Sequence, residues 1–327
     1  MKYNKLGERG PEVSTMSFGA WAIGGLNWGK TDDEVSLKAL HEAIDRGVNL
    51  IDTADVYGFG HSEKLIAKIL QERGRDQVVI ASKAGNDFYN ATDKDDHGYG
   101  PIKQTYTFDY LVEAVEKSLQ RLKVDTIDIL QLHSPKLDRL EEEEPWRALE
   151  QLKKDGKIKH AGWSVQSFQE SEQAHILDRH HELLDCIQVR YNLLERNAEE
   201  LLFPKAMKYG IGVIVRIPIL FGLLSGKFSE QSTFSEDDHR HMNLSEEKLK
   251  IYLEQLKRYK PLFERYPDQT MTQVSLRFCV SHPACHTAIP GAKTALQVEE
   301  NCASSDLGPI PQEVLQQFPA DMDVGGS

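Results

Sequence analysis

Cysteine is scarce in this 327-residue chain and follows none of the spacings that give it a structural role. There are four in all: Cys186, Cys279, Cys285 and Cys302. No CxxC pair occurs, so reduced thiols are expected rather than disulfides. One run, Cys279 to His286, holds the residue types of a zinc site, but it closes a helical pattern that Pro283 breaks. Its side chains would point in different directions, and we predict no bound metal.

Positive charge and long apolar runs are also lacking. Lys and Arg number 39 against 51 Asp and Glu, so the formal net charge is −12. This balance disfavours nucleic acid and anionic membranes as partners. No apolar run approaches the roughly 20 residues of a membrane-spanning helix, and the amino-terminal run MKYNKLGERG lacks the apolar core of a secretory signal. We therefore expect a soluble cytoplasmic protein; its oligomeric state is open, and a monomer fits the sequence.

A third absence concerns nucleotide binding in open sheets. A doubly wound sheet should carry the motif GxGxxG at its first turn, and the run Gly58 to Glu63 lacks the third glycine. Apolar strand-like runs nevertheless alternate with amphipathic helical runs, eight of each. Eight such units with right-handed crossovers close a parallel sheet into a (β/α)8 barrel. We expect one domain over residues 1–319 and a disordered tail over 320–327.

The expected elements follow from these patterns. The strands are predicted at 16–20, 48–51, 78–82, 127–132, 159–163, 185–189, 212–217 and 286–289. The helices are predicted at 33–46, 62–72, 108–122, 146–155, 168–179, 198–209, 246–264 and 294–304. Residues 3–6 and 13–15 flank the turn GERGPE and are typical of a small hairpin. Two connections are long, residues 84–105 and 228–244, and we expect the first to overhang the active face.

Residues with reactive side chains stand where three of these strands end. Asp52 ends the strand at 48–51, and Tyr57 follows in a loop that contains Gly58 and Gly60. Lys83 ends the next strand along the chain, and His133 ends the one after it. Enzymes built on parallel strands place their chemistry at this carboxyl end of the sheet. We therefore expect the four side chains to meet.

The runs NLIDTADVYGFGHSE, VVIASK and IDILQLHSP closely resemble the corresponding segments of the aldo-keto reductases. Four residues of four types, in order and each at a strand terminus, make the match specific, and the resemblance extends along nearly the whole chain. The chain is similar to the branch that includes potassium-channel beta subunits. The resemblance implies a (β/α)8 barrel whose floor the amino-terminal hairpin closes. It also implies a catalytic tetrad: Asp52, Tyr57, Lys83 and His133.

The tetrad suits the reduction of a small aldehyde or ketone. Hydride addition to a carbonyl leaves an alkoxide that must receive a proton, and Tyr57 would donate it. A nearby ammonium, Lys83, is expected to lower the pKa of the phenol, with Asp52 holding that ammonium. His133 would donate a hydrogen bond to the substrate oxygen. Since no side chain supplies hydride, a nicotinamide cofactor is required.

The resemblance implies that an extended NADP(H) lies across the barrel mouth, with NADP(H) preferred to NAD(H). Trp21 would line the substrate side together with Tyr57 and His133. Lys293 would meet the 2′-phosphate, close to a helix N-terminus at Thr294 that attracts phosphate. The positions carried over as cofactor-binding are Ala20, Trp21, Asp52, Ser164, Gln188, Arg216, Ile217, Pro218, Gly222, Lys227, Gly291, Lys293, Gln297, Glu300 and Asn301.

Two positions depart from the family pattern. Relatives often have Asn where this chain has Val165, which removes one amide contact. Relatives typically place an aromatic residue, which stacks on the nicotinamide, where this chain has Arg216. A guanidinium is planar and can stack on a ring, but it carries a fixed positive charge beside a ring that is cationic when oxidised. We therefore predict weaker binding of the oxidised than of the reduced cofactor, relative to an Arg216→Trp variant.

Three other functions are compatible with parts of the sequence. The run from Gly24 to Thr31 matches the P-loop expression GxxxxGK[ST], but three carboxylates directly after it would repel phosphate, and Thr31 with Glu34 instead has the spacing of a capping box. Trp28 suits a lid or pocket wall better than a phosphate cradle. Lys83 could be the nucleophile of a Schiff-base aldolase, which leaves Tyr57 and Asp52 without a role. A cofactor-sensing binding protein with little turnover is the third alternative.

Overall fold

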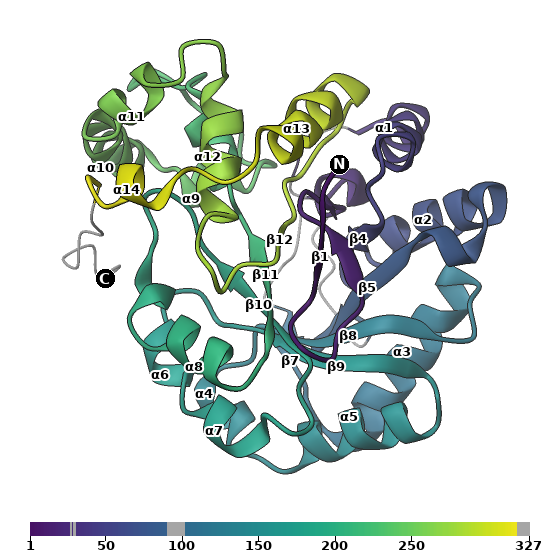
Figure 1. The fold of residues 1–327 in the computed structure, drawn as a ribbon. Coiled ribbons are helices and arrows are strands. Elements are labelled where there is room, and N and C mark those ends of the chain that lie inside the picture. The colour runs from purple at the N-terminus through teal and green to yellow at the C-terminus, as the bar shows by residue number, and fades with distance from the viewer. Residues whose placement is uncertain (27, 29–30, 90–101, 319–327) are drawn as a thin grey trace.

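Eight parallel strands form the centre of the computed structural model, which describes residues 1–26, 28, 31–89 and 102–318. Neighbouring strands pair in the order β12-β11-β10-β9-β8-β5-β4-β3, and the helices surround them (Figure 1). The strands are β3 (Phe18–Gly19), β4 (Leu50–Asp52), β5 (Val79–Ala84), β8 (Ile127–His133), β9 (Ile158–Ser164), β10 (Cys186–Arg190), β11 (Gly212–Arg216) and β12 (Thr287–Ala288). The predicted strands are thereby confirmed in number and order.

The first and last strands meet and close the sheet into a barrel. Met16 pairs with Ala288 and Gly19 with Gly291 in isolated parallel bridges. The Ser17 amide donates to the Ala288 carbonyl at 2.8 Å. The (β/α)8 barrel expected from the sequence is therefore the observed fold. Its strands are apolar because helices cover their outer side while side chains fill the interior; six of the seven residues of β8, all but His133, are buried.

The helices lie near their predicted positions, but several are broken. The longer ones are α1 (Asp33–Asp45), α2 (His61–Arg73), α3 (Phe108–Leu122), α5 (Glu144–Lys154), α10 (Glu246–Lys257), α12 (Met271–Cys279) and α13 (Ala295–Leu307). The shorter ones are α4 (Leu137–Leu140), α6 (Glu170–Gln173), α7 (Ile176–His180), α8 (Leu202–Lys208), α9 (Arg240–Asn243), α11 (Lys260–Glu264) and α14 (Gln312–Leu315). Single 3-10 turns cover Ala22–Gly24, Arg75–Gln77 and Asn197–Glu199, and a kinked one covers Leu220–Ser225.

Two expectations about helices are corrected by the structure. The helix predicted over 246–264 is interrupted, and α11 begins with Pro261 in its first turn, a residue that lacks the amide needed to continue α10. The cap of α1 is Asp32, whose carboxylate accepts the Val35 amide at 3.0 Å. The predicted cap, Thr31, lies one residue too early.

The amino-terminal hairpin covers the barrel floor. Strand β1 (Tyr3–Lys5) pairs antiparallel with β2 (Glu12–Ser14), as the turn chemistry predicted, and the hairpin lies across the barrel in Figure 1. Leu6 and Val13 belong to a buried cluster with residues from the barrel strands. Gly7 follows with φ 64°, and a Cβ there would lie 2.4 Å from the Gly212 amide nitrogen, so only glycine permits this approach. The hairpin thus plugs the end opposite to the reactive residues.

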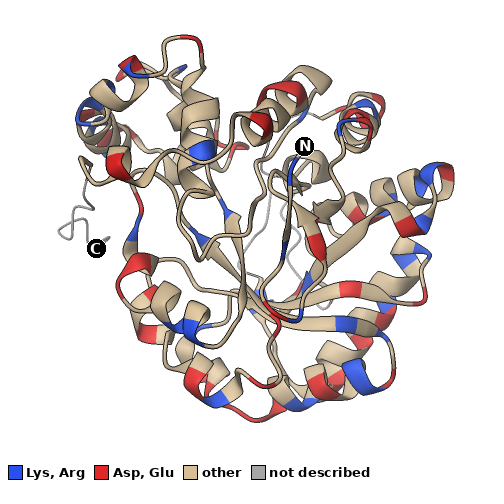
Figure 2. Ribbon diagram, in the orientation of Figure 1, with Lys and Arg blue, Asp and Glu red and all other residues tan. Residues whose placement is uncertain are grey.

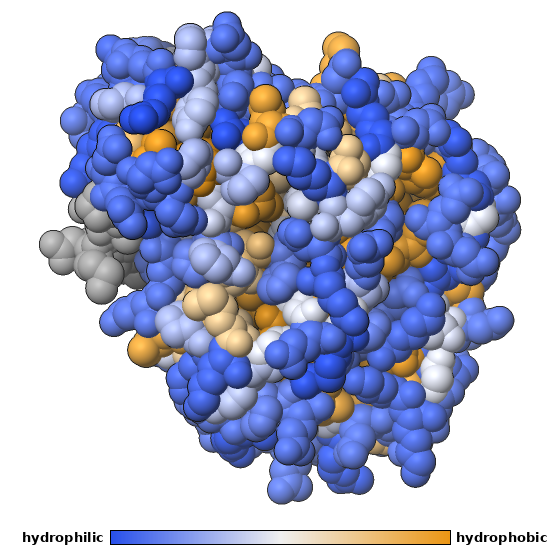
Figure 3. All heavy atoms as spheres, viewed as in Figure 1, coloured by the Kyte–Doolittle hydropathy of each residue, from blue (hydrophilic) through white to orange (hydrophobic). Residues whose placement is uncertain are grey.

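The surface of the barrel is strongly charged. Figure 2 shows acidic and basic residues mainly on the outer helices, and the face in Figure 3 is largely hydrophilic with scattered apolar residues. Within the described ranges, no helix has the length and apolar character needed to span a bilayer.

Three predicted segments lie partly or wholly outside the described residues. The connection 84–105 contains a short antiparallel pair, β6 (Asn86–Asp87) and β7 (Lys103–Gln104), at its two ends. Residues 90–101 between them, residues 27, 29 and 30 of the P-loop-like run, residue 319 and the whole predicted tail, 320–327, are not described.

The buried hairpin at the barrel floor is expected to contribute to the stability of the fold. Leu6 has no exposed surface, so Leu6→Ala should lower the free energy of unfolding by about 2–5 kcal/mol through lost burial and a residual cavity. Urea denaturation measures this change. Leu296→Ala, at a side chain that is 77% exposed, is the matched control and should stay within about 0.5 kcal/mol of the native chain. Equal losses in the two variants would contradict the floor's role.

Candidate active site

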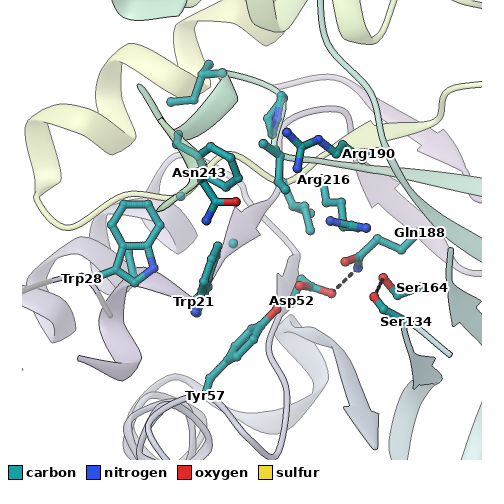
Figure 4. Close-up of a pocket in the computed structure, with 18 of the residues that line it drawn as sticks. Trp21, Trp28, Asp52, Tyr57, Ser134, Ser164, Gln188, Arg190, Arg216 and Asn243 are labelled. Atoms are coloured by element: carbon teal, nitrogen blue, oxygen red, sulfur yellow. Dashed lines mark hydrogen bonds between the residues drawn. The ribbon is translucent and has the colours of Figure 1, made fainter. Parts of the chain in front are cut away.

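A cavity of about 710 Å³ opens at the carboxyl ends of the barrel strands. Its wall includes the ends of β4, β8, β9, β10 and β11 together with residues from the loops that follow β3, β11 and β12. Figure 4 shows Asp52, Gln188, Ser164 and Arg216 directed into one space. Three of the four predicted reactive residues, Asp52, Tyr57 and His133, line this cavity, and the fourth, Lys83, is hydrogen-bonded to Asp52.

The Lys83 ammonium is the centre of this arrangement. Its Nζ donates to Asp52 Oδ1 at 2.6 Å, to the Thr53 carbonyl at 2.8 Å and to the Tyr57 hydroxyl at 3.4 Å. The side chains of Lys83 and Asp52 are 1% and 3% exposed. Burial lowers the pKa of Lys83, and the Asp52 carboxylate opposes that fall. The ion pair is thus dry, and its charges are held by short hydrogen bonds.

The second oxygen of Asp52 is also held. Gln188 Nε2 donates to Oδ2 at 2.6 Å, and Gln131 Nε2 lies 3.4 Å from the same atom. The Asp52 backbone carbonyl accepts the Ala20 amide at 2.8 Å. With its nitrogen bound to Asp52, the Gln188 amide keeps its oxygen as an acceptor for a further ligand.

Tyr57 lies at the inner edge of the cavity. Its ring stacks near Trp21, with centroids 6.2 Å apart, and meets the His133 ring edge to face at 5.8 Å. Burial, followed by the Asp52 charge, raises the pKa of Tyr57 well above its ordinary value. This net direction of the pKa is opposite to the one predicted from the sequence, because burial of the phenol and then the Asp52 charge outweigh the influence of nearby cations. The phenol therefore stays protonated at neutral pH.

His133 ends β8 and faces the same space. Burial, then the charges of Lys83 and Arg216, lower its pKa well below 6.5, so the imidazole is neutral. Its Nδ1 is buried without a hydrogen-bond partner. Its backbone carbonyl accepts the Tyr106 hydroxyl at 2.7 Å, which fixes the end of the strand. A neutral ring retains one N–H to donate to a carbonyl oxygen.

Most of the residues predicted to bind cofactor line the cavity, but four do not. Those that do are Trp21, Asp52, Ser164, Gln188, Arg216, Ile217, Pro218, Gly222, Gly291, Lys293 and Gln297. Ala20 is fully buried behind the wall and Asn301 is buried in α13. Lys227 and Glu300 lie away from the lining, and Lys227 is exposed. Eleven of the fifteen predicted positions thus share one cavity, and the other four lie outside its lining.

Strand β11 ends in an unusual backbone. Ile217, Leu220 and Phe221 have φ values of 56°, 43° and 56°, in the left-handed region that non-glycine residues avoid. The Ile217 carbonyl is held by Asn192 Nδ2 at 3.2 Å. Such conformations cost on the order of 1–3 kcal/mol each and concentrate at functional sites. The strain here lies where the chain turns along the cavity wall.

The loop after β12 joins the cavity to a helix N-terminus. Thr294 and Gln297 form a capping box at the start of α13, and the Gln297 carboxamide also accepts the Lys293 amide at 2.7 Å. Helix initiation at Thr294 is therefore confirmed, with the side chain of Gln297 used as part of the cap. The Lys293 ammonium donates to the Trp28 carbonyl and lies 5.5 Å from the centroid of the Trp28 ring.

Trp28 is part of the wall, as its size suggested. It pairs with Asp238 in an isolated antiparallel bridge. Its ring packs on His239 with centroids 4.3 Å apart, and the guanidinium of Arg240 lies 5.7 Å from it. The loops after β3 and β11 are therefore joined beside the cavity.

Several residues that line the cavity were not predicted from the sequence: Ser134, Ser167, Arg190, Arg240 and Asn243. Trp28 was predicted as a pocket wall, but its contacts were not. Alternation along β10 was a usable signal for Arg190, since residues two apart in a strand share a face and Gln188 was already predicted. Arg240 and Asn243 lie in the long connection after β11, where no periodicity indicates which side chains turn inward.

The donors fit a dinucleotide cofactor. Among the described residues, four cationic side chains line the cavity against one carboxylate, Asp52, in a chain whose net charge is −12; the cations are Arg190, Arg216, Arg240 and Lys293. Ser164 Oγ and the Gln188 oxygen are available for a polar carboxamide, and the start of α13 favours phosphate. The cavity thus has an amide-binding end, at Ser164 and Gln188, and a cationic end, where Arg240 and Lys293 lie beside Trp28.

The same cavity argues against the other functions considered. Lys83 is fully engaged by Asp52 and Thr53, which does not suit the free amine of a Schiff-base nucleophile. The carboxylates of Asp32, Asp33 and Glu34 occupy the start of α1, the helix that a P-loop would present to phosphate. Among the described residues, no group of three His, Cys, Asp or Glu side chains is arranged to hold a metal ion.

The family of the chain follows from comparison with known proteins. The model of the aldo/keto reductase family matches residues 15–320. The chain belongs to the aldo/keto reductase family. It is 33% identical over 303 residues to the aldo-keto reductase YhdN of Bacillus subtilis, covering 91% of this chain and 87% of that protein. The predicted family is thereby confirmed.

Other members place this aldo/keto reductase in a varied group. It is 30% identical over 328 residues to a probable voltage-gated potassium channel subunit beta of Arabidopsis thaliana (95% and 93% of the two chains), which confirms the predicted branch. It is 30% identical over 318 residues to the NADH-specific methylglyoxal reductase of Escherichia coli (94% of each). The glycerol dehydrogenase AKR11B4 from Gluconobacter oxydans has a similar structure, with a TM-score of 0.80 and 29% identity over 99% and 98% of the chains.

The buried ion pair between Asp52 and Lys83 is also expected to affect the free energy of unfolding. Asp52→Ala leaves a buried ammonium without its counterion and should lower the free energy of unfolding by about 3–5 kcal/mol. The double variant Asp52→Ala with Lys83→Met should lose less than the sum of the two single losses, because no uncompensated charge remains. Urea denaturation of all four proteins closes the cycle. Strictly additive losses would show that the pair is not energetically coupled.

Proposed function

We propose that this chain is an NADP(H)-dependent reductase of small aldehydes and ketones, with Tyr57 as the proton donor. The observation that carries the proposal is the Lys83 ammonium, bound to Asp52 at 2.6 Å and 3.4 Å from the Tyr57 hydroxyl, in a cavity that His133 also lines. Membership of an oxidoreductase-containing family supports it.

Each tetrad residue has a distinct task in this proposal. A nicotinamide held in this cavity would supply the hydride that adds to the carbonyl carbon, leaving the electron pair of the C=O π bond on oxygen. Tyr57 transfers its phenolic proton to that oxygen, which completes the alcohol. The Lys83 ammonium, 3.4 Å away, stabilises the phenolate left behind. Asp52 keeps Lys83 in position, and the neutral His133 donates a hydrogen bond to the carbonyl oxygen and orients it.

The raised pKa of Tyr57 fits a role as acid. Because burial and Asp52 favour the phenol over the phenolate, the group carries its proton through neutral pH. It is also a weaker acid than a free phenol, so transfer depends on the developing alkoxide being more basic still. Trp21 and Trp28 wall the cavity on one side and limit the water that competes for that proton.

Discrimination between NADP(H) and NAD(H) is assigned to the cationic end of the cavity. Lys293 and Arg240 both lie against the Trp28 ring and both line the cavity. Arg240 is neutralised by Asp238, whereas Lys293 donates to a neutral carbonyl. Lys293 is thus the cation best placed to meet an additional phosphate. One similar protein is named as NADH-specific, so the preference for NADPH over NADH has to be measured for each member of the family separately.

The substrate is proposed to be a small carbonyl compound. Two similar proteins are named as a methylglyoxal reductase and a glycerol dehydrogenase. A cavity that must also hold the cofactor leaves limited room for the substrate. We further propose that residues 1–319 act as one domain, since the barrel closes between its first and last strands. A cofactor-sensing protein is the second candidate, favoured by the similarity to potassium channel beta subunits.

The decisive experiment measures binding and turnover separately. Quenching of protein fluorescence by NADPH and NADH gives the two dissociation constants, and a panel of small aldehydes and ketones with NADPH gives turnover. Binding with turnover supports the reductase. Tight binding with no turnover across the panel favours the sensor, and no binding of either cofactor removes both proposals.

Replacing the phenol tests the acid. Tyr57→Phe should lower kcat by about 10²- to 10⁴-fold, the usual contribution of a positioned proton donor, while the dissociation constant of NADPH changes little. Steady-state kinetics and fluorescence titration measure the two quantities. Tyr209→Phe removes a hydroxyl that donates to Asp178 at an exposed site and should retain native kcat. A Tyr57→Phe protein with native kcat would exclude Tyr57 as donor.

Replacing the ammonium at the cationic end tests cofactor choice. Lys293→Met should raise the dissociation constant of NADPH by about 10- to 100-fold, as expected for one charge-assisted contact, and leave that of NADH nearly unchanged. Lys260→Met, at an ammonium whose side chain is 75% exposed, is the control for lost charge. A parallel loss of affinity for both cofactors would contradict recognition of the extra phosphate by Lys293.

A further inference from the structure

Arg216 is a cation of the cavity wall that lacks a carboxylate partner among the described residues. Its Nη2 donates to the Val165 carbonyl at 2.9 Å and to Ser167 Oγ at 3.0 Å, both neutral acceptors. Its Nε is buried without any partner. The pKa of Arg216, lowered to about 10 by burial and then by Arg190, leaves the guanidinium charged at neutral pH. A full positive charge is therefore fixed in the wall.

The neighbouring charged groups do not remove this charge. Arg190 lies beside Arg216 in Figure 4, and Glu195 already binds Arg190. Glu170 is the other acid whose charge reaches Arg216, but burial raises its pKa and its Oε1 accepts the Phe168 amide at 3.2 Å. Asp52, the carboxylate of the cavity lining, is bound by Lys83. Locally, the cation at Arg216 remains uncompensated.

Arg216 also lies close to the reacting groups. After burial and Asp52, its charge is the next influence on the pKa of Tyr57. After burial and Lys83, it is the next influence on the pKa of His133. A nicotinamide that delivers hydride to a carbonyl held by Tyr57 and His133 must lie against these same groups. Any productive position of that ring therefore falls within the field of the Arg216 guanidinium.

We infer that Arg216 makes this cavity discriminate between the two redox states of the nicotinamide, binding the reduced form and disfavouring the oxidised form. This inference rests on the proposed function. The oxidised ring carries a positive charge and the reduced ring does not, while the remainder of the cofactor is the same in both. A fixed cation in a partly desolvated wall therefore repels only the oxidised form.

The discrimination has two consequences for the reaction. Oxidised cofactor dissociates readily after each turnover, which favours operation as a reductase. By linkage, a site that prefers the reduced form makes the potential of the bound couple more positive than that of the free couple. The occupancy of the cavity then follows the ratio of reduced to oxidised cofactor more steeply than it would with a neutral residue at 216.

Calorimetric binding of NADP⁺ and NADPH to the native chain and to Arg216→Gln tests the inference without turnover. The ratio of the NADP⁺ to the NADPH dissociation constant should fall by about tenfold or more in Arg216→Gln, given the strength of a charge–charge interaction near a protein surface. Arg216→Lys retains the charge and should keep most of the native ratio, whereas Arg216→Trp should lose it. Arg265→Gln removes one positive charge from an exposed site and should leave the ratio unchanged.

The outcomes separate the inference from the function beneath it. NADP⁺ binding as tightly as NADPH to the native chain overturns the inference, whichever variants fold. An unchanged ratio in Arg216→Gln, with a raised KM only for carbonyl substrates that carry a carboxylate, also overturns it and assigns Arg216 to substrate. Binding of neither form to the native chain defeats both the inference and the reductase proposal. Intact NADPH binding with a collapsed ratio in the variant supports both.

Discussion

The ion pair between Lys83 and Asp52 is the constraint on which the site depends. Two opposite charges are removed from water at the mouth of the barrel, and they are tolerable there only because each is saturated by close partners. That requirement fixes the positions of the Thr53 carbonyl and the Gln188 amide around the pair. The strand ends that supply these groups, β4, β5 and β10, must therefore keep a single register relative to one another. Pairing of β4 with β5 and of β9 with β10 along the sheet provides that register.

A second constraint is the separation of charge along the cavity. The reactive end holds two compensated cations, Lys83 and Arg190, and one uncompensated cation, Arg216. The distal end holds Arg240, paired with Asp238, and Lys293, which faces a neutral carbonyl. A strongly acidic chain thus keeps a positive interior where the proposed dinucleotide would bind, while its acidic residues are displayed mainly on the outer helices. Long-range repulsion from the surface is screened by salt, whereas attraction inside the cavity is screened less.

The barrel and the tetrad could be predicted from the sequence because both depend on local patterns. Alternating apolar runs place Asp52, Lys83 and His133 at strand ends, and parallel pairing then brings them together.

Properties that depend on long-range packing could not be predicted as well from the sequence. The pKa of Tyr57 is set by burial from all sides, so the single neighbour Lys83 gave the wrong direction. The cap of α1 moved from Thr31 to Asp32 because two adjacent residues both have capping side chains. The β-bridge between Trp28 and Asp238 joins segments more than 200 residues apart in the chain, and no motif in the sequence indicates that they pair.

The contact between the Lys293 ammonium and the Trp28 carbonyl ties the β12 loop to the β3 loop across the cavity rim. A phosphate bound at Lys293, as proposed, would share this ammonium with the Trp28 carbonyl, because an ammonium has three N–H donors. The proposed phosphate contact and the tie between the two loops would then be coupled through one side chain, so substitutions in the β3 loop should alter cofactor affinity.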